Sequence, residues 1–216
     1  MKIVVLDGYT ENPGDLSWEA LAALGDLTVY DYTAPAETAA RSQDTEILIT
    51  NKTVLSGELI AALPKLRYIG LLSTGYNVVD IAAAKAREIP VCNIPTYGTE
   101  SVAQMVFALL LELTNQVGLH SESVKAGEWS ASRDFSYWKT PLLELAGKTM
   151  GFVGFGKIGQ RAADIAQAFG MSVIAYDLYP QPQERPRFRY GTLDEVLAAA
   201  DVLSLNCALT PENTGF

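Results

Sequence analysis

The chain has 216 residues, of which 49% are hydrophobic and 19% are charged, which is enough for one large or two ordinary globular domains. A net charge of −9 and a pI near 4.6 argue against a nucleic-acid-binding protein, because displacing counterions from nucleic acid requires clustered cations. The most apolar run, Val102–Leu111, is too short to span a membrane and contains Gln104.

The N-terminus and the two cysteines predict a cytoplasmic protein. The opening MKIVVLDG reaches an acid at Asp7 too early for a signal peptide. Cys92 and Cys207 are far apart and lack the spacing of metal ligands. We therefore expect two buried thiols in a reducing cytosol and no metal site.

Residues 1–98 are predicted to form an α/β domain with a parallel sheet, because short apolar runs alternate with helix-like stretches. This segment has no phosphate-binding fingerprint of its own. The predicted strands are Ile3–Leu6, Leu27–Tyr30, Glu46–Thr50, Tyr68–Leu72 and Val91–Asn93. The predicted helices are Trp18–Leu24, Ala34–Arg41, Gly57–Leu63 and Val79–Ala86.

A long apolar helix is predicted over residues 101–118. Ser101 and Gln104 have the spacing of a capping box at its start. Burial in a core is the plainer interpretation of its apolar face, and a position between domains or subunits is the alternative. That face comprises Val102, Met105, Val106, Leu109, Leu110, Leu113 and Val117.

Residues 149–177 carry the most informative pattern in the chain. An apolar run ending at Val153 leads into Gly154, Gly156 and Gly159, and small apolar residues then follow at helical spacing as far as Gly170. A second apolar run ends in Asp177. Strand, glycine turn, helix, strand and acid in this order predict a dinucleotide-binding crossover. A glycine turn in an ordinary crossover is the alternative.

Each glycine has a predicted role in that crossover. Gly154 allows a sharp turn out of the strand, and Gly156 lets main-chain N–H groups approach a diphosphate. Gly159 lets the helix pack closely on the strand. The first N–H groups of the helix lack intrahelical partners and lie at the positive end of its dipole, so they suit a diphosphate.

Asp177 favours NAD over NADP. A carboxylate at this position accepts hydrogen bonds from ribose hydroxyls, and it would repel a 2′-phosphate by about 4 kcal/mol at ~4 Å and an effective dielectric of ~20. Arg185, Arg187 and Arg189 are the competing signal, because they could neutralise such a phosphate. They lie in a proline-rich stretch, for which we predict a solvated connector. A capping box at Thr192 then opens a helix to Ala200, and residues 201–206 form a third strand.

Several ordered segments resemble the D-isomer-specific 2-hydroxyacid dehydrogenases, and the bacterial glycerate dehydrogenase (hydroxypyruvate reductase) branch is the most similar. The resemblance extends over essentially the whole chain. The segments are VLDGYTENPGDLSWEAL near the start, TNKTVL at 50–55, STGYNVVDIAAA at 73–84, YGTESVAQMVFALLLEL at 97–113, PLLELAGKTMGFVGFGKIG at 141–159 and LNCALTPENTG at 205–215.

The resemblance implies reversible hydride transfer between NAD and a small 2-hydroxy or 2-oxo acid bound between two α/β domains. It implies a flavodoxin-like substrate domain over 1–98 and the first half of a Rossmann domain over 99–216. A homodimer through helix 101–118 is a further implication. An NAD-responsive binding or assembly module without catalysis is the alternative, and a methyltransferase is a weaker one.

The resemblance also assigns site residues. Implied substrate-binding residues are Asn51, Lys52, Thr74 and Gly75, although Lys52 also fits an ordinary surface lysine. Implied coenzyme-binding residues are Val102, Gly154, Gly156, Lys157, Ile158, Gly159, Asp177, Cys207, Ala208 and Thr210. Asn206 and Ala208 depart from the family pattern, in which histidine and proline are usual.

The catalytic arginine, glutamate and histidine that the resemblance implies are not found in residues 1–216. The only histidine is His120, close to the end of the predicted long helix, and we predict a structural role for it. We therefore expect an incomplete chain, whether a truncated gene product, a proteolytic fragment or a partial polypeptide. We expect these 216 residues alone to be inactive.

Overall fold

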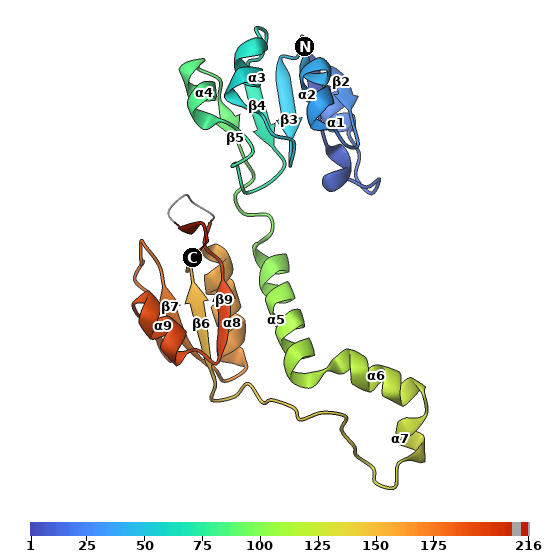
Figure 1. Cartoon of the computed structure of the whole chain (residues 1–216), viewed down its shortest axis with the longest axis vertical. Helices are drawn as coiled ribbons and strands as arrows, with labels where there is room; N and C mark the ends of the chain where they lie inside the picture. Colours follow the sequence, from blue (N-terminus) through green and yellow to red (C-terminus); the bar gives the residue numbers. More distant parts are fainter. Residues whose placement is uncertain (209–212, 216) are drawn as a thin grey trace. The chain divides into compact units, whose positions relative to one another are not determined.

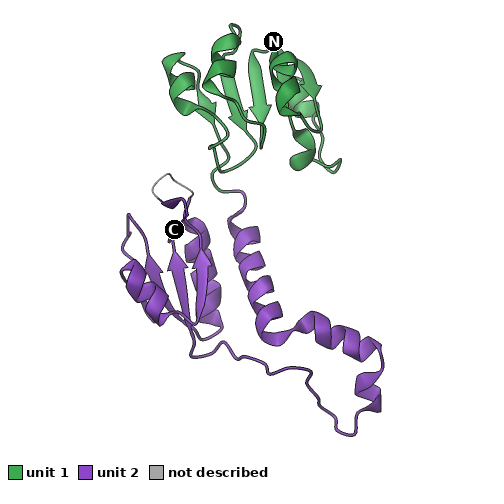
Figure 2. Cartoon of the chain, viewed as in Figure 1, with its two compact units in different colours: residues 1–96 green, residues 97–216 purple. Residues whose placement is uncertain are grey.

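The protein folds into two compact units, residues 1–96 and 97–216 (Figure 2). The computed structural model describes residues 1–208 and 213–215. Each unit is built on a parallel β-sheet accompanied by helices (Figure 1). The predicted fold class of two parallel-sheet α/β domains is therefore confirmed.

Unit 1 has a five-stranded parallel sheet in the order β2-β1-β3-β4-β5. This is the flavodoxin-like order, in which the direction of winding reverses beside β1. The strands are β1 (Lys2–Val5), β2 (Asp26–Val29), β3 (Ile47–Thr50), β4 (Tyr68–Leu71) and β5 (Val91–Cys92). The helices are α1 (Glu19–Ala22), α2 (Pro35–Ser42), α3 (Gly57–Ala62) and α4 (Ile81–Ala86). All nine predicted elements are therefore present, with ends shifted by only one or two residues.

Alternating side chains of the central strands place a hydrophobic core on each face of the unit 1 sheet. Val4 and Leu6 belong to the larger core, whereas Ile3 and Val5 belong to the smaller one on the opposite face. This period of two is what a strand buried on both faces requires.

Unit 2 has a four-stranded parallel sheet in the order β8-β7-β6-β9. The strands are β6 (Thr149–Val153), β7 (Ser172–Tyr176), β8 (Phe188–Tyr190) and β9 (Val202–Leu205). The helices are α5 (Thr99–Asn115), α6 (Val117–Lys125), α7 (Glu128–Ala131), α8 (Lys157–Ala168) and α9 (Leu193–Ala199). Helix α5 packs on α8, and Phe107 of α5 stacks on Phe169 with ring centroids 5.5 Å apart.

The predicted helix over 101–118 is wrong at both ends. Helix α5 starts at Thr99 after the N-cap Gly98, so Ser101 does not cap it. Gln116 adopts a left-handed conformation with φ of 47°, which ends α5 at Asn115 and separates it from α6. Among the residues described, no single helix has the length and hydropathy of a membrane span; α5 and α6 reach them only when joined across a 60° bend.

The predicted apolar face of this helix is largely exposed rather than buried. Met105, Leu109 and Leu113 are 57%, 61% and 77% exposed. The buried face of α5 comprises Ala103, Phe107, Leu110 and Thr114, of which only Leu110 belongs to the predicted face. The periodicity located an apolar stripe, but the interpretation of Met105 and its neighbours as core is wrong.

Two further predictions fail in the connecting segments. The proline-rich stretch is no simple solvated connector, because Arg189 lies in the edge strand β8 and Arg185 is only 16% exposed. Cys92 and Cys207 are both exposed. Cys92 ends β5 and Cys207 follows β9, and both strands lie at the edge of their sheets. Neither cysteine therefore has a neighbouring strand on both sides, as a residue of an interior strand has.

Candidate functional site

The turn after β6 requires glycine at its first position. Gly154 has a φ of 87°, which side-chain-bearing residues rarely adopt. A Cβ on Gly154 would lie 2.5 Å from the main-chain nitrogen of Cys207. The turn is thus held between β7, whose Tyr176 carbonyl accepts from the Gly154 N–H at 2.8 Å, and the segment that follows β9.

The other two glycines contrast with each other. A Cβ on Gly159 would lie 2.8 Å from the Gly154 carbonyl oxygen, so the close packing of α8 on the turn depends on its absence. Gly156 is the N-cap of α8, and no described heavy atom lies within 4 Å of where its Cβ would be. Lys157 is exposed and Ile158 is half-buried at the start of the helix. The first main-chain N–H groups of a twelve-residue helix therefore adjoin open space, which suits an anionic group.

Asp177 lies directly beside this turn. Its Oδ2 accepts a hydrogen bond from the Phe155 main-chain N–H at 2.6 Å, and its Oδ1 accepts from the Tyr179 N–H at 2.8 Å. The carboxylate is half-buried at the end of β7. These two bonds fix its orientation while each oxygen keeps acceptor capacity for a ribose hydroxyl.

The segment after β9 contributes the far edge of the same site. Cys207 and Ala208 are exposed, and the Cys207 main chain lies against Gly154. The Ala208 carbonyl accepts from the Asn213 side-chain amide at 2.7 Å. Asn206 turns its own amide back to the Ser204 hydroxyl at 3.0 Å. Thr210 lies outside the described residues.

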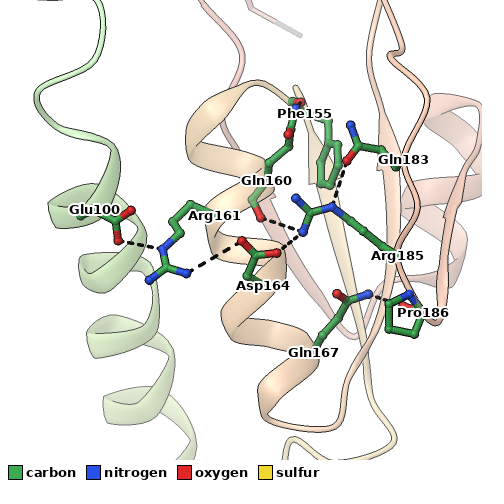
Figure 3. Close-up of polar contacts among 9 residues, drawn as sticks. All are labelled: Glu100, Phe155, Gln160, Arg161, Asp164, Gln167, Gln183, Arg185 and Pro186. Carbon is green, nitrogen blue, oxygen red and sulfur yellow. Dashed lines mark hydrogen bonds and ion pairs between the residues drawn. The ribbon is translucent and has the colours of Figure 1, made fainter.

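A chain of ion pairs fixes the start of α5 against α8 (Figure 3). Arg161 of α8 donates to Glu100 of α5 at 2.7 Å, and this hydrogen bond raises the pKa of the guanidinium above its ordinary value. Val102, which is 41% exposed, lies half a turn beyond Glu100. The structure therefore brings the turn of α5 that carries Val102 to the helix that begins at the glycine turn.

In unit 1, the predicted Asn51 and Lys52 are organised by a residue that the sequence did not single out. The carboxylate of Asp7 is 3% exposed and accepts from the main-chain N–H groups of Asn51 at 2.8 Å, Lys52 at 2.5 Å and Thr53 at 2.8 Å. The Thr50 hydroxyl adds a fourth bond at 3.2 Å. Asp7 ends the first strand-like run of the chain, and that position is the one local signal that could have identified it.

The side chains in this loop differ in accessibility. Asn51 is buried, and its amide donates to the Thr10 hydroxyl at 2.9 Å and to the Glu11 carboxylate at 2.5 Å. Lys52 is exposed and lines a groove of about 830 Å³ together with Thr10 and Tyr32. Of the two predicted residues, only Lys52 has an exposed side chain.

Thr74 and Gly75 lie at the same edge of the sheet, because β3 and β4 are parallel neighbours and Thr50 pairs with Leu71. Both residues are exposed. The Thr74 hydroxyl donates to the Ile94 carbonyl at 2.8 Å, and the Thr74 carbonyl accepts from the Asn93 amide at 2.7 Å. These bonds leave the main chain of the loop accessible.

His120 has the structural role predicted for it. Its Nδ1 bonds to the Gln116 carbonyl at 2.9 Å, and its Nε2 accepts from the Lys139 N–H at 3.2 Å. Because a carbonyl can only accept, Nδ1 carries the proton. Both ring nitrogens are therefore engaged in holding the segment after α7 to α6.

Comparison with known proteins places these features in one family. The family model for the D-isomer specific 2-hydroxyacid dehydrogenase NAD binding domain matches residues 107–216. A hydroxypyruvate reductase from Blautia hydrogenotrophica is 51% identical over 219 residues, which covers 100% of this chain and 68% of the relative. A glycerate dehydrogenase from Methylorubrum extorquens is 36% identical over 82% of this chain and 55% of the relative.

The fold is shared with solved structures as well. D-lactate dehydrogenase from Aquifex aeolicus, complexed with NAD and lactic acid, matches with a TM-score of 0.79 and 29% identity. The match covers 98% of this chain and 62% of that one. The chain thus spans about two thirds or less of the length of the proteins that it resembles.

Proposed function

The chain belongs to the D-isomer specific 2-hydroxyacid dehydrogenase family, and on that basis we propose that it supplies the substrate-binding and NAD-binding parts of an NAD-dependent oxidoreductase. The proposed reaction moves a hydride between NAD(H) and a small 2-hydroxy or 2-oxo acid such as glycerate or hydroxypyruvate. The names of the two curated relatives support this substrate class.

The glycine turn is the single observation that carries the proposal. NAD, when bound, supplies the hydride acceptor. Gly156, Lys157 and Ile158 would hold its diphosphate at the start of α8, where main-chain N–H groups adjoin open space. Asp177, already oriented by the Phe155 and Tyr179 N–H groups, would accept from the adenosine ribose. Cys207 and Ala208 would border the adenosine, and Val102 would contact the nicotinamide.

On the substrate side, we propose that the exposed loop at Thr74 and Gly75 binds the carboxylate of the acid through main-chain N–H groups. Lys52 would contribute a positive charge from the neighbouring strand end. Its ammonium is accessible, whereas Asn51 is committed to Thr10 and Glu11 and would act by shaping the loop.

We expect a polypeptide of residues 1–216 to bind NADH without turning over substrate. Its only histidine is engaged at both ring nitrogens, so it is not free to transfer a proton to substrate. Titration of NADH fluorescence with the purified chain tests binding, and a coupled assay with glycerate and NAD tests turnover. Absence of NADH binding by the folded chain would refute the proposed function, and glycerate-dependent NADH formation would refute the expected inactivity.

A second function, as an assembly module, is favoured by the exposed apolar stripe on α5. Met105, Leu109 and Leu113 expose more than half of their surface, as expected of a self-association surface. We propose a homodimer through this stripe, in a cytoplasmic protein. Leu109→Glu is expected to give a monomer by light scattering, whereas Ala108→Glu, the same charge change at the exposed neighbouring position, leaves a dimer. A monomeric native chain at micromolar concentration would refute the dimer.

A further inference from the structure

The three arginines that follow Asp177 have partners elsewhere in unit 2. Arg185 donates to the Asp164 carboxylate of α8, to the Gln160 carbonyl at 3.2 Å and to the Gln183 amide at 2.9 Å (Figure 3). Arg187 donates to the Gln167 carbonyl in the last turn of the same helix and to the Gly170 carbonyl just beyond its end. The guanidinium of Arg189 lies beside Gly191, at the start of α9. The three guanidinium groups that could favour a 2′-phosphate therefore already have partners within the protein.

Of these, Arg185 lies against a residue of the glycine turn. Its guanidinium lies over the ring of Phe155, 5.8 Å from the centroid. The main-chain N–H of that same Phe155 donates to Asp177. Phe155 thus contacts both the Arg185 guanidinium, through its ring, and the Asp177 carboxylate, through its main-chain N–H.

Asp164 is what neutralises this cation. One of its oxygens accepts from Arg185, and the other lies 3.8 Å from Arg161, whose main partner is Glu100. Asp164 is itself 47% exposed, so the fold does not depend on its burial. Among the described residues, Asp164 is the only one that pairs a carboxylate with Arg185.

We propose that Asp164 is a specificity-determining residue that keeps the site selective for NAD by holding and neutralising Arg185 on α8. Asp177 repels a 2′-phosphate, and Asp164 prevents a nearby cation from offsetting that repulsion. The inference rests on the proposed NAD-binding function and adds to it a second carboxylate that does not touch the coenzyme.

The expected effect follows from charge alone. Replacing Asp164 by Asn leaves Arg185 with an uncompensated positive charge on the Phe155 ring. At a separation on the order of 10 Å and with partial screening by salt, one unit charge acting on a phosphate changes a dissociation constant by roughly fivefold to tenfold. The diphosphate is common to NADH and NADPH, so its contribution cancels in the ratio of their dissociation constants, and only the effect on the 2′-phosphate remains.

The test is to titrate NADH and NADPH into four chains, namely the native protein, Asp164→Asn, Arg185→Gln and the double variant. Asp164→Asn should tighten NADPH binding relative to NADH binding by roughly fivefold to tenfold, and the gain should shrink at high ionic strength. The double variant should lose that gain, because the effect acts through Arg185. Asp194→Asn, an exposed acid on α9, is the matched control for net charge and should leave the NADPH-to-NADH ratio unchanged.

Three results would overturn the proposal. A ratio unchanged in Asp164→Asn while NADH still binds would refute it and leave the proposed function intact. Parallel weakening of both dinucleotides would show that Asp164 is merely structural. Failure of the native chain to bind NADH would remove the proposed function and this inference together. Circular dichroism of each variant establishes that the chain is folded before titration.

Discussion

The two units differ in what lies beside their clustered main-chain N–H groups. Each places a carboxylate beside main-chain N–H groups at the end of a parallel strand. In unit 1, Asp7 is buried and takes the N–H groups of residues 51–53 as its own ligands. In unit 2, the N–H groups at the start of α8 adjoin open space above Gly156, and Asp177 stands at the side.

An open anion site in this fold requires main-chain N–H groups that no internal carboxylate has taken. Clustered N–H groups attract a negative charge in either unit, and the side chains decide whether that charge is internal. The buried carboxylate of Asp7 accepts from the N–H groups in unit 1, whereas the space beside Gly156 in unit 2 is open, as the proposed diphosphate site requires. The N–H groups in unit 1 are therefore already bonded within the protein, whereas those at the start of α8 adjoin open space.

Removing the internal anion should have the largest effect. Asp7→Ala leaves three main-chain N–H groups without their carboxylate, and we expect a loss of about 3–5 kcal/mol in the free energy of unfolding. Urea denaturation followed by fluorescence measures it in a Trp129→Phe/Trp138→Phe background, in which Trp18 of unit 1 is the only tryptophan. Asp15→Ala, at an exposed position, should change stability by less than about 0.5 kcal/mol. Equal stability of the two variants would contradict the internal-anion role of Asp7.

The next largest effects should come from alanine substitutions at two glycines of the same turn, one of which should alter stability and the other NADH binding. Gly154→Ala combines an unfavourable φ with a clash against the Cys207 main chain, so it should cost about 2–4 kcal/mol of stability. Gly156→Ala places its methyl group in open space, so it should change stability by about 1 kcal/mol or less. The same methyl group should weaken NADH binding by about tenfold or more, equivalent to ~1.4 kcal/mol.

Denaturant melts and NADH titrations on both variants decide the comparison. A Gly156→Ala chain that binds NADH as tightly as the native protein would show that the open space above the turn is not the diphosphate site. A Gly154→Ala chain of native stability would show that the turn relaxes more readily than its contacts suggest.

The sequence predicted the local structure around the glycine turn far better than the hydrogen bonds of Asp7. Residues 149–177 are a local pattern, in which strand, turn and helix are each encoded within a few residues. The bonds of Asp7 join residues more than 40 positions apart, so they depend on β1 and β3 being neighbours. No periodicity in a single sequence specifies that pairing.

The failures share this physical reason. Exposure of Cys92 and Cys207 depends on strand order, because both lie at or beyond strands on sheet edges. The break at Gln116 depends on one left-handed residue that helix propensity does not forbid. The apolar stripe of α5 was found, but which stripe faces the core was decided by α8.

The smallest expected effect contrasts how the two units cap their helices. Thr192 and Glu195 form a reciprocal capping box on α9, with the Glu195 carboxylate accepting from the Thr192 N–H at 2.7 Å. That hydrogen bond lowers the pKa of Glu195 below its ordinary value of 4.5. Helix α3 in unit 1 has only the Ser56 hydroxyl, which accepts from Leu59 N–H at 3.2 Å.

A lowered pKa in the folded state gives stability that is present above pH 4.5 and is lost as the pH falls through the lower folded value. Glu195→Ala should therefore lower the midpoint of thermal unfolding at neutral pH, and the variant and native midpoints should converge in acid. Ser56→Ala, which removes no titrating group, should cost about 1 kcal/mol at both pH values. A Glu195→Ala deficit that persists unchanged in acid would mean that the side chain stabilises α9 by packing rather than by its charge.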